Sequence, residues 1–449
     1  SAYATSVIDF NSIPPKIALK YKFIGFDRTN ANISDANGNL IAYTNGVHLF
    51  NSEDEIVQNG SNFYPSTTYA YGYVVPQAAL LLPFPDKPNL LVFILCGMVD
   101  YYYEQVLRPG CSPLTYSIVD MNENNGNGKV IEKKSVLSSD TLLNGQLTAV
   151  KHGNGRDWWI IGDPMHGSNT YHKFLLSPQG IALHDEQAIG EIVHPGLGQA
   201  AISPNGDWIA LYEWYGLAGA TDTEINLYKF DRCSGQLSDH LKIFYAEGLP
   251  GGVAFSPNNR FMYIANWDKI YQFDLQASDI PASRITVAEY DGFLDERGLP
   301  TRFFNMKLAP DNKIYVNISN VNSRYLHVID QPDSVGVACN VLQHSVLLPT
   351  YNTFSIPHHP VYRLGVLEGS PCDTLTSSIV DNNLPESKNW TVFPNPASGE
   401  ITIKSNQALS GNLSICDIAG KTLFYLRMEG SENQYSLDVT SLPPGIYFL

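Results

Sequence analysis

Apolar and polar positions alternate every two residues over most of the chain, and turns rich in Pro, Asn, Asp and Gly interrupt the alternation. The stretch GGVAFSPNNRFMYIANWDKIYQFDL at 251–275 is representative. It predicts a small apolar strand, a Pro-Asn-Asn turn and two further strands in which every second residue is apolar. A period of two with such turns indicates β-strands and not helices.

The same pattern returns at a nearly fixed interval. The turn positions 154, 205, 258 and 311 are separated by 51, 53 and 53 residues, as 205 − 154, 258 − 205 and 311 − 258 give. Two earlier units surround the turns at 37–38 and 88–89. Each unit continues with a second pair of predicted strands. Six units of four strands each, repeated at about 40–50 residues, are typical of β-propeller blades.

The two ends of this region, residues 1–28 and 351–367, lie outside the six units. Both contain strand-like segments, IALKYKFIGF at one end and FSIPHHPVYRLG at the other. A ring of sheets has to protect its edges, so we expect the two ends to pair and form one more blade. The sequence therefore predicts a seven-bladed propeller over residues 1–367. A six-bladed ring with the ends outside it is the alternative.

An insertion widens the step between the second and third units. We expect residues 97–113 to form a tyrosine-rich loop, flanked by Cys96 and Cys111. Tyr101, Tyr102 and Tyr103 could stack on sugars or pack against a protein partner. The alternative for these and the other aromatic residues is packing within the propeller.

Residues 368–389, EGSPCDTLTSSIVDNNLPESKN, are rich in Ser, Asp, Asn and Pro and predict a linker. The segments after it, TVFPNPASGEITIKS, LSICDIAGKTLFYL and YSLDVTSLPPGIYFL, alternate apolar and polar residues between glycine-containing turns. They predict a small β-sandwich of the immunoglobulin-like type over residues 390–449.

The propeller region resembles a group of secreted β-propeller proteins of Bacteroidota. The resemblance covers about residues 7–367 and rests on segments in the same order, among them DFNSIPP, ISDANGNLIAYTNGVHLFN, LTAVKHGNGRDWWII, GGVAFSPNNRFMYIA and KLAPDNKIYV. It implies a fold and a secreted location more than an activity.

The tail resembles the C-terminal sorting domain of the type IX secretion system, the Por secretion tail family. The residues at its motif positions are Pro394, Asn395, Pro396, Asp417, Gly420, Lys421, Gly445 and Tyr447. The resemblance implies an extracellular or outer cell surface location, with the type IX outer-membrane export machinery as a partner and surface polysaccharide or other surface proteins as further partners. The family continues with another strand where this sequence stops, so we expect an open sheet edge through which the tail could self-assemble.

The composition of the chain limits the classes of partner that we expect. Of 449 residues, 44% are hydrophobic, which is enough for a large core, and the formal net charge is -16. Such a charge repels phosphate backbones, so nucleic-acid binding is not expected. No run of about 18 apolar residues occurs, so no membrane span is predicted. The chain begins at Ser1, which suggests a processed amino terminus.

Six cysteines without CxxC spacing do not predict a zinc site. In an oxidising compartment the favoured disulfides are Cys96 with Cys111 and Cys339 with Cys372. Six cysteines permit 15 connectivities, and free buried thiols are a further alternative.

Three Asp-Ser/Thr-apolar triplets resemble the O-glycosylation acceptor of the same phylum. Their acceptor residues are Thr141, Ser334 and Thr374.

One stretch combines imidazoles with carboxylates. Its candidates for a transition metal or for acid–base chemistry are His152, Asp157, Asp163, His166 and His172. Their spacing fits no closed metal site, so no catalytic residue and no metal ligand is predicted. His358-His359, between two prolines, is a second pair that could bind a ligand but that we expect to close the last blade.

Two segments, around Asp35 and around Asp120, have the alternating oxygen ligands of a calcium loop but lack the glutamate at the twelfth position. Ordinary hairpin turns have the same composition. The sequence predicts no cofactor, with calcium as the alternative.

These observations favour a non-enzymatic protein of the cell surface that binds, adheres or assembles. The alternative is a propeller hydrolase that acts on a lactone or a polysaccharide. No GxSxG, HExxH or phosphate-loop motif occurs in the sequence.

Overall fold

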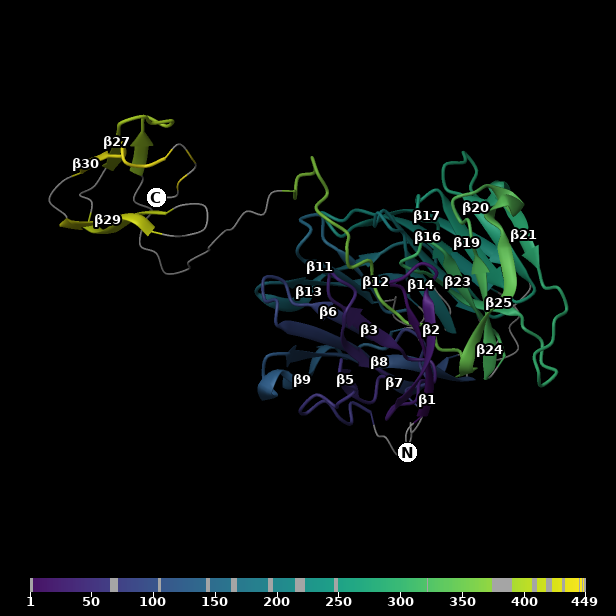
Figure 1. The fold of residues 1–449 in the computed structure, drawn as a ribbon. Helices are drawn as coiled ribbons and strands as arrows, with labels where there is room; N and C mark the ends of the chain where they lie inside the picture. Colours follow the sequence, from purple (N-terminus) through teal and green to yellow (C-terminus); the bar gives the residue numbers. More distant parts are fainter. Residues whose placement is uncertain are drawn as a thin grey trace. The chain divides into compact units, whose positions relative to one another are not determined.

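In a computed structural model of the chain, antiparallel β-sheets joined by turns make up nearly all of the regular structure (Figure 1). The short 3-10 helices span Asn124–Gly126, Pro281–Ser283 and Gly336–Cys339. The structure describes residues 3–64, 72–103, 106–142, 146–162, 168–192, 197–214, 223–245, 249–320, 322–373, 390–405, 410–416, 422–429, 433–443, 445 and 447. The chain divides into two compact units, residues 1–375 and 376–449.

In the first unit, consecutive strands form one sheet after another. The first of these sheets contains β3 (Ala31–Ser34), β4 (Leu40–Thr44) and β5 (Leu49–Asn51). The second contains β6 (Ala79–Pro83), β7 (Leu90–Tyr103), β8 (Val106–Asp120) and β9 (Lys129–Ser138). The third contains β10 (Thr148–Lys151), β11 (Trp158–Gly162), β12 (Thr170–Ser177) and β13 (Gly180–Ala188).

The series continues with three more sheets of four strands. The fourth contains β14 (Leu197–Ile202), β15 (Trp208–Trp214), β16 (Thr223–Phe230) and β17 (Leu237–Tyr245). The fifth contains β18 (Gly251–Phe255), β19 (Phe261–Asn266), β20 (Lys269–Asp274) and β21 (Ile285–Glu289). The sixth contains β22 (Phe303–Leu308), β23 (Ile314–Ile318), β24 (Ser323–Ile329) and β25 (Val341–Asn352).

The sheets pack face to face. The apolar cluster of Tyr212, Ile225, Val253 and Phe255 joins the fourth sheet to the fifth, and similar clusters join the other neighbours. The first strands of consecutive sheets also lie next to one another, while fourth strands such as β13 carry many exposed residues. Four-stranded sheets that stack with their first strands innermost make a β-propeller-like fold. The repeat read from the sequence thus corresponds to the observed sheets.

Amide side chains recur on the innermost strands and hold the sheets together. An amide residue stands at the same position of the repeat, within or just before the first strand, in five of the six sheets, at Asn30, Gln77, Gln146, Gln199 and Asn305. Gln199 donates to the carbonyl of Met306 at 2.5 Å and accepts from the amide of Val253 at 3.1 Å, which links three sheets.

The fifth sheet has Gly252 at this position of the repeat. A Cβ atom there would lie 2.2 Å from Oε1 of Gln199, so the glycine leaves room for the glutamine.

The amino-terminal residues form a two-stranded sheet of their own. β1 (Tyr3–Asp9) pairs with β2 (Lys16–Lys22), and the hairpin contacts the sixth sheet through a hydrogen bond of 2.6 Å between the hydroxyls of Ser6 and Thr350. On its other side Lys22 forms an ion pair with Asp54, which follows the first sheet. The hairpin therefore bridges the last sheet and the first.

The expected pairing of the two ends does not occur, because the strand at 16–22 pairs with 3–9 and residues 353–367 contain no strand. Pro357 and Pro360 have no backbone N–H, so the segment lacks two of the donors that a β-strand needs. The side chains of His358 and Tyr362 form hydrogen bonds with other parts of the chain instead.

The insertion at 97–113 is not a loop. β7 and β8 continue through it as one long hairpin, in which Tyr101 faces Arg108 and Tyr103 faces Val106. These pairs lie beyond residues 91–95, which pair with β6, and 114–120, which pair with β9.

Two disulfides lie in the first unit. Cys96 pairs with Cys111 across the β7–β8 hairpin, which is the pairing the sequence favours. The other favoured pair, Cys339 with Cys372, is wrong: Cys372 pairs with Cys233, and the thiol of Cys339 is free. Cys339 is buried in the cluster between the fifth and sixth sheets, whereas Cys372 lies beside Gly153 of the third.

The second unit consists of two small sheets. One contains β26 (Trp390–Phe393), β27 (Glu400–Ser405) and β30 (Gln434–Asp438), and the other contains β28 (Ser410–Cys416) and β29 (Thr422–Glu429). Ile403, Ile415, Met428 and Leu437 form a core to which both sheets contribute.

Candidate functional site

The axis of the propeller-like unit, where ligands often bind in such folds, is filled by the chain itself. After β25, residues 355–367 run between the innermost strands (Figure 1). The amide of His358 donates to the carbonyl of Asn30 at 2.6 Å, just before β3. The hydroxyl of Tyr362 donates to the carbonyl of Leu81 in β6 at 2.6 Å. We call residues 355–367 the axial segment.

The axial segment runs in the same direction as the innermost strands. Near its beginning, Nε2 of His358 contacts the carbonyl of Leu147, just before β10. Near its end, the amide of Leu367 donates at 2.7 Å to the carbonyl of Gly153, just past β10. Lys307 of the sixth sheet donates to the carbonyl of His359 at 2.5 Å. The segment therefore contacts sheets on several sides of the axis.

His358 is fully hydrogen-bonded within the protein. Its Nε2 donates to the carbonyl of Leu147 at 2.7 Å, and its Nδ1 accepts from the amide of Gln77 at 3.1 Å. Gln77 in turn exchanges two hydrogen bonds with the backbone of Ala200, at 2.9 and 2.7 Å. Burial lowers the pKa of His358 to about 3, so the imidazole is neutral and both of its nitrogens are used.

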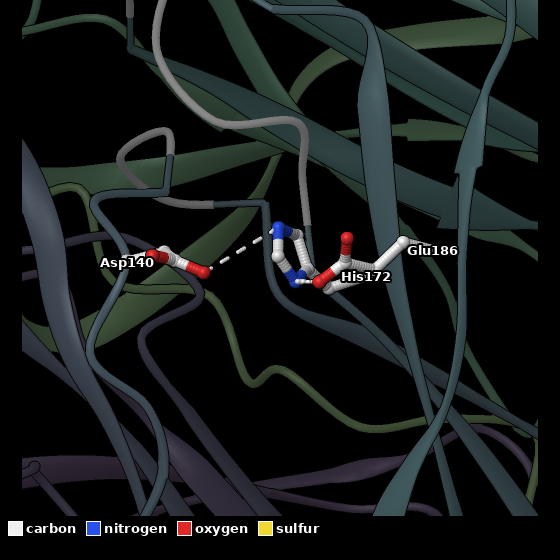
Figure 2. A group of neighbouring side chains, drawn as sticks. All are labelled: Asp140, His172 and Glu186. Atoms are coloured by element: carbon white, nitrogen blue, oxygen red, sulfur yellow. Dashed lines mark ion pairs between the residues drawn. The ribbon is translucent and has the colours of Figure 1, made fainter.

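A second group of titratable residues lies at the edge of the unit, away from the innermost strands. His172 of β12 has a carboxylate on each side, Asp140 and Glu186 (Figure 2). Its Nδ1 lies 3.4 Å from Oε1 of Glu186, and its Nε2 lies 3.9 Å from Oδ2 of Asp140. The histidine is 3% exposed, while both carboxylate side chains are half exposed. We call these three residues the rim cluster.

Backbone pairing positions the rim cluster. His172 and Glu186 stand directly opposite each other in the β12–β13 hairpin, so their side chains lie on one face of the third sheet. Asp140 follows β9 of the second sheet, where two hydrogen bonds of 2.9 Å between Leu142 and Cys111 hold the chain. Cys111 is itself fixed to Cys96, so the disulfide anchors the segment that carries Asp140.

The structure separates the residues that the sequence grouped around His172. His152 and Asp157 lie in the turn between β10 and β11, where the carboxylate of Asp157 accepts from Arg156 at 2.7 Å. Asp163 and His166 lie outside the described residues.

Glu186 was not recognised from the sequence as a neighbour of His172. The turn at 178–179 alone would place residue 172 opposite residue 185, and a β-bulge between Lys173 and Phe174 shifts the pairing so that His172 lies opposite Glu186.

The two calcium-like segments are hairpin turns. The side-chain amide of Asn39 donates to Oδ2 of Asp35 at 2.9 Å, and the backbone amides of Asn39 and Asn37 donate to its Oδ1, both at 2.8 Å. These bonds, the side-chain bond first, lower the pKa of Asp35. Asp120 accepts from the amide of Asn122 at 2.9 Å. In both segments a carboxylate oxygen is used to fix the turn.

The residues of the expected sorting motif lie in the second unit. Pro394, Asn395 and Pro396 follow β26, and the hydroxyl of Tyr447 donates to the carbonyl of Pro443 at 2.5 Å. Gly445 is also described, whereas Asp417, Gly420 and Lys421 lie outside the described residues. Of the glycosylation candidates, Thr141 and Ser334 are partly exposed and Thr374 is outside that set.

Comparison with known solved structures finds distant likenesses. A protein from Lactobacillus plantarum is 12% identical, with 92% of this chain and 99% of that chain covered and a TM-score of 0.38. A protein from Bacteroides uniformis proposed to be a 6-phosphogluconolactonase is 11% identical, with 72% and 96% covered and a TM-score of 0.38. The propeller of Dos1 is 10% identical, with 73% and 76% covered and a TM-score of 0.42. No activity is transferred from these structures.

No curated protein matches the sequence. Residues 391–449 match the family of secretion system C-terminal sorting domains. Among the described residues, no helix has the length and apolar character needed to cross a membrane. The second unit is therefore a sorting domain of the type IX secretion system, and the protein is exported to the cell surface or the extracellular space.

Proposed function

We propose that this protein is a non-enzymatic binding protein of the cell surface, and that the β1–β2 hairpin is part of its contact surface. The observation that carries this proposal is an exposed apolar stripe on the hairpin and its flanks. The side chains of the stripe are Ile13 (93% exposed), Ile17 (40%), Leu19 (45%), Tyr21 (68%) and Phe23 (70%).

The stripe is contiguous because of strand geometry. Residues 17, 19 and 21 alternate along β2 and so lie on one face of the strand, while Ile13 lies before its start and Phe23 directly after its end. In the part of the chain that the structure describes, β2 has β1 as its one hydrogen-bonded neighbour, which leaves the other edge of β2 for a partner. Several large apolar side chains together on a surface are typical of an interaction site.

The chemistry of the stripe favours a protein partner over a glycan. Three of its five members are aliphatic, and aliphatic side chains gain most by packing against other apolar side chains. Sugars are bound mainly by flat aromatic faces together with polar groups. The free edge of β2 also suits the addition of a strand from a partner.

The filled axis supports binding on the outside of the unit. His358 and Tyr362 of the axial segment are bonded to groups of this same chain. A propeller hydrolase, the alternative function, would need imidazoles or carboxylates that converge on a substrate there. The tip of the β7–β8 hairpin, with Tyr101, Tyr102 and Tyr103, is a second candidate contact.

Finer features belong to the same proposal. We propose that β1–β2 closes the ring as a reduced seventh blade, and that the second unit is immunoglobulin-like. The contacts of the hairpin with Thr350 on one side and with Asp54 on the other support the first of these points.

Binding to cells tests the proposed function. Fluorescently labelled protein is added to intact cells of the producing bacterium, either untreated, treated with protease, or treated with periodate to oxidise glycans. We expect binding to survive periodate and to be lost after protease treatment. The double variant Tyr21→Ser, Phe23→Ser should bind at least about ten-fold more weakly, because aromatic residues often dominate interfaces.

A matched control uses two apolar residues on outer strands of other sheets, Leu183 (49% exposed) and Phe244 (52% exposed). The variant Leu183→Ser, Phe244→Ser should bind as the unchanged protein does. If periodate abolishes binding, or if the hairpin variant binds normally, the proposal is wrong. Size-exclusion chromatography of each variant measures its oligomeric state. A variant that binds cells weakly but keeps the oligomeric state of the unchanged protein has lost a partner and not self-assembly.

A further inference from the structure

We propose that the rim cluster binds a divalent transition-metal cation of the Zn²⁺ class, with Nε2 of His172 and Oδ2 of Asp140 as ligands and Glu186 as the residue that orients the imidazole. The cluster lies apart from the hairpin stripe, so this site is independent of the proposed binding surface.

The unpaired nitrogen of His172 points to a ligand. The side chain is 3% exposed, and among the described residues its Nε2 has no hydrogen-bond partner. A buried polar atom without a partner destabilises the folded state, and native proteins rarely leave one. In the axial segment, by contrast, both ring nitrogens of His358 form hydrogen bonds. The rim cluster therefore needs a further group to complete it.

The distance to Asp140 fits a bridging ion. Nε2 of His172 and Oδ2 of Asp140 are 3.9 Å apart, which is too far for a hydrogen bond. Two metal–ligand bonds of about 2.0–2.2 Å span roughly 3.3 to 4 Å, depending on the angle at the metal. An ion therefore fits between these two atoms with little movement of either side chain.

Glu186 fixes the tautomer that such an ion needs. Its Oε1 lies 3.4 Å from Nδ1 of His172, on the opposite side of the ring from Asp140 (Figure 2). A proton on Nδ1 that points at this carboxylate leaves the lone pair of Nε2 free for a metal. A carboxylate behind a metal-bound histidine is a common arrangement and raises the basicity of the ligand.

The donor set selects the class of cation. An imidazole nitrogen suits Zn²⁺ and its neighbours, while Ca²⁺ and Mg²⁺ take oxygen ligands. Two direct protein ligands leave coordination positions for water or for a group from a partner, so we expect weaker binding than at a closed four-ligand site. The half-exposed side chain of Asp140 gives the ion access from solvent.

Titration with zinc tests the site. The untagged full chain, freed of metal with a chelator, is titrated with Zn²⁺ by calorimetry, and bound metal is counted by mass spectrometry. We expect one site per chain that the variants Asp140→Asn and His172→Gln each weaken at least about ten-fold. Glu186→Gln should weaken it less, because its amide oxygen can still accept the proton of Nδ1.

A matched control is the pair of His344 and Asp291, where Nε2 of the histidine already lies at hydrogen-bond distance, 3.0 Å. Asp291→Asn should leave zinc binding unchanged. Excess Ca²⁺ or Mg²⁺ should not displace the zinc. Circular dichroism of each variant verifies the fold, and Asp140→Asn alters a half-exposed side chain, so it keeps the test valid if His172→Gln misfolds.

Two results would overturn the inference. One is a chain that takes up no zinc at concentrations well above those at which exposed single histidines bind it. The other is a zinc site with the same affinity in Asp140→Asn and in the unchanged protein, which would place the ion elsewhere.

Discussion

The axis and the rim of the first unit both contain a buried histidine held between neighbouring sheets, but the two histidines differ in what surrounds their nitrogens. On the axis, Gln77 and the carbonyl of Leu147 use both nitrogens of His358. At the rim, Nε2 of His172 has no hydrogen-bond partner in the described part of the chain and lies beside two carboxylates. Burial of a histidine alone therefore does not indicate a site. The rim differs because its unpaired nitrogen lies next to a carboxylate.

The largest effect should come from breaking the axis. Gln77→Met removes the partner of His358 and leaves the backbone amide and carbonyl of Ala200 unpaired. We expect the free energy of unfolding to fall by about 4 kcal/mol, since several buried polar groups lose partners at once. Urea unfolding followed by fluorescence measures the change. Gln276→Met, at an exposed turn, is the control and should cost less than about 0.5 kcal/mol.

The disulfide between Cys233 and Cys372, which lies just after the axial segment, should rank next. It closes a loop with a sequence separation of 139 residues. Cys372→Ser is expected to lower the free energy of unfolding by about 3 kcal/mol, because a long loop is released in the unfolded chain. Cys339→Ala should cost only about 1 kcal/mol. Equal losses for the two variants would mean that Cys339 and Cys372 are paired after all.

Acid should destabilise the packing around the axial segment. Burial lowers the pKa of His358 from its ordinary 6.5 to about 3. Between these values the unfolded chain binds a proton that the folded chain does not, so stability falls as the pH falls through this window. At pH 5 the loss from this residue is about 2 kcal/mol relative to neutral pH. Denaturant unfolding at several pH values measures it.

The free energy of unfolding should fall less steeply with falling pH in His358→Gln than in the unchanged protein. The control His184→Gln, which alters an exposed residue, should show the same pH dependence as the unchanged protein. A profile that His358→Gln leaves as steep as before would show that the axial imidazole does not cause the loss.

The smallest effect should be the stabilisation by zinc at the rim. An ion at ten times its dissociation constant stabilises the folded chain by about 1.4 kcal/mol. Scanning calorimetry should show a higher melting temperature with Zn²⁺ for the unchanged protein and no rise for Asp140→Asn. An equal rise in melting temperature in both proteins would show that zinc stabilises the chain by binding somewhere other than the rim cluster.

The sequence predicted the repeated sheets because each sheet is local: its strands follow one another, and the period of two and the turns mark them. The Cys96–Cys111 pair is local in the same sense. The axial segment was not predictable in this way. Pro357-His358-His359-Pro360 has no strand pattern, and its partners, Asn30 and Leu147 among them, lie hundreds of residues away in the chain.

The rim cluster falls between these cases. The pairing of His172 with Glu186 is local to one hairpin, but the turn at 178–179 by itself would place His172 opposite Asp185. A β-bulge between Lys173 and Phe174 shifts the register to Glu186. The approach of Asp140 depends on how the second sheet packs on the third. Sequence patterns do not contain that packing, so the cluster needed the structure.

The disulfide between Cys233 and Cys372 also determines which part of the chain takes up a pulling force on the tail. Everything beyond Cys372, including the sorting domain, is joined to the first unit through this residue. Traction on an anchored tail would otherwise pull the axial segment out of the ring one hydrogen bond at a time. The covalent link would pass that tension to the turn between β16 and β17, so the axial segment would stay in place in a molecule held by its tail.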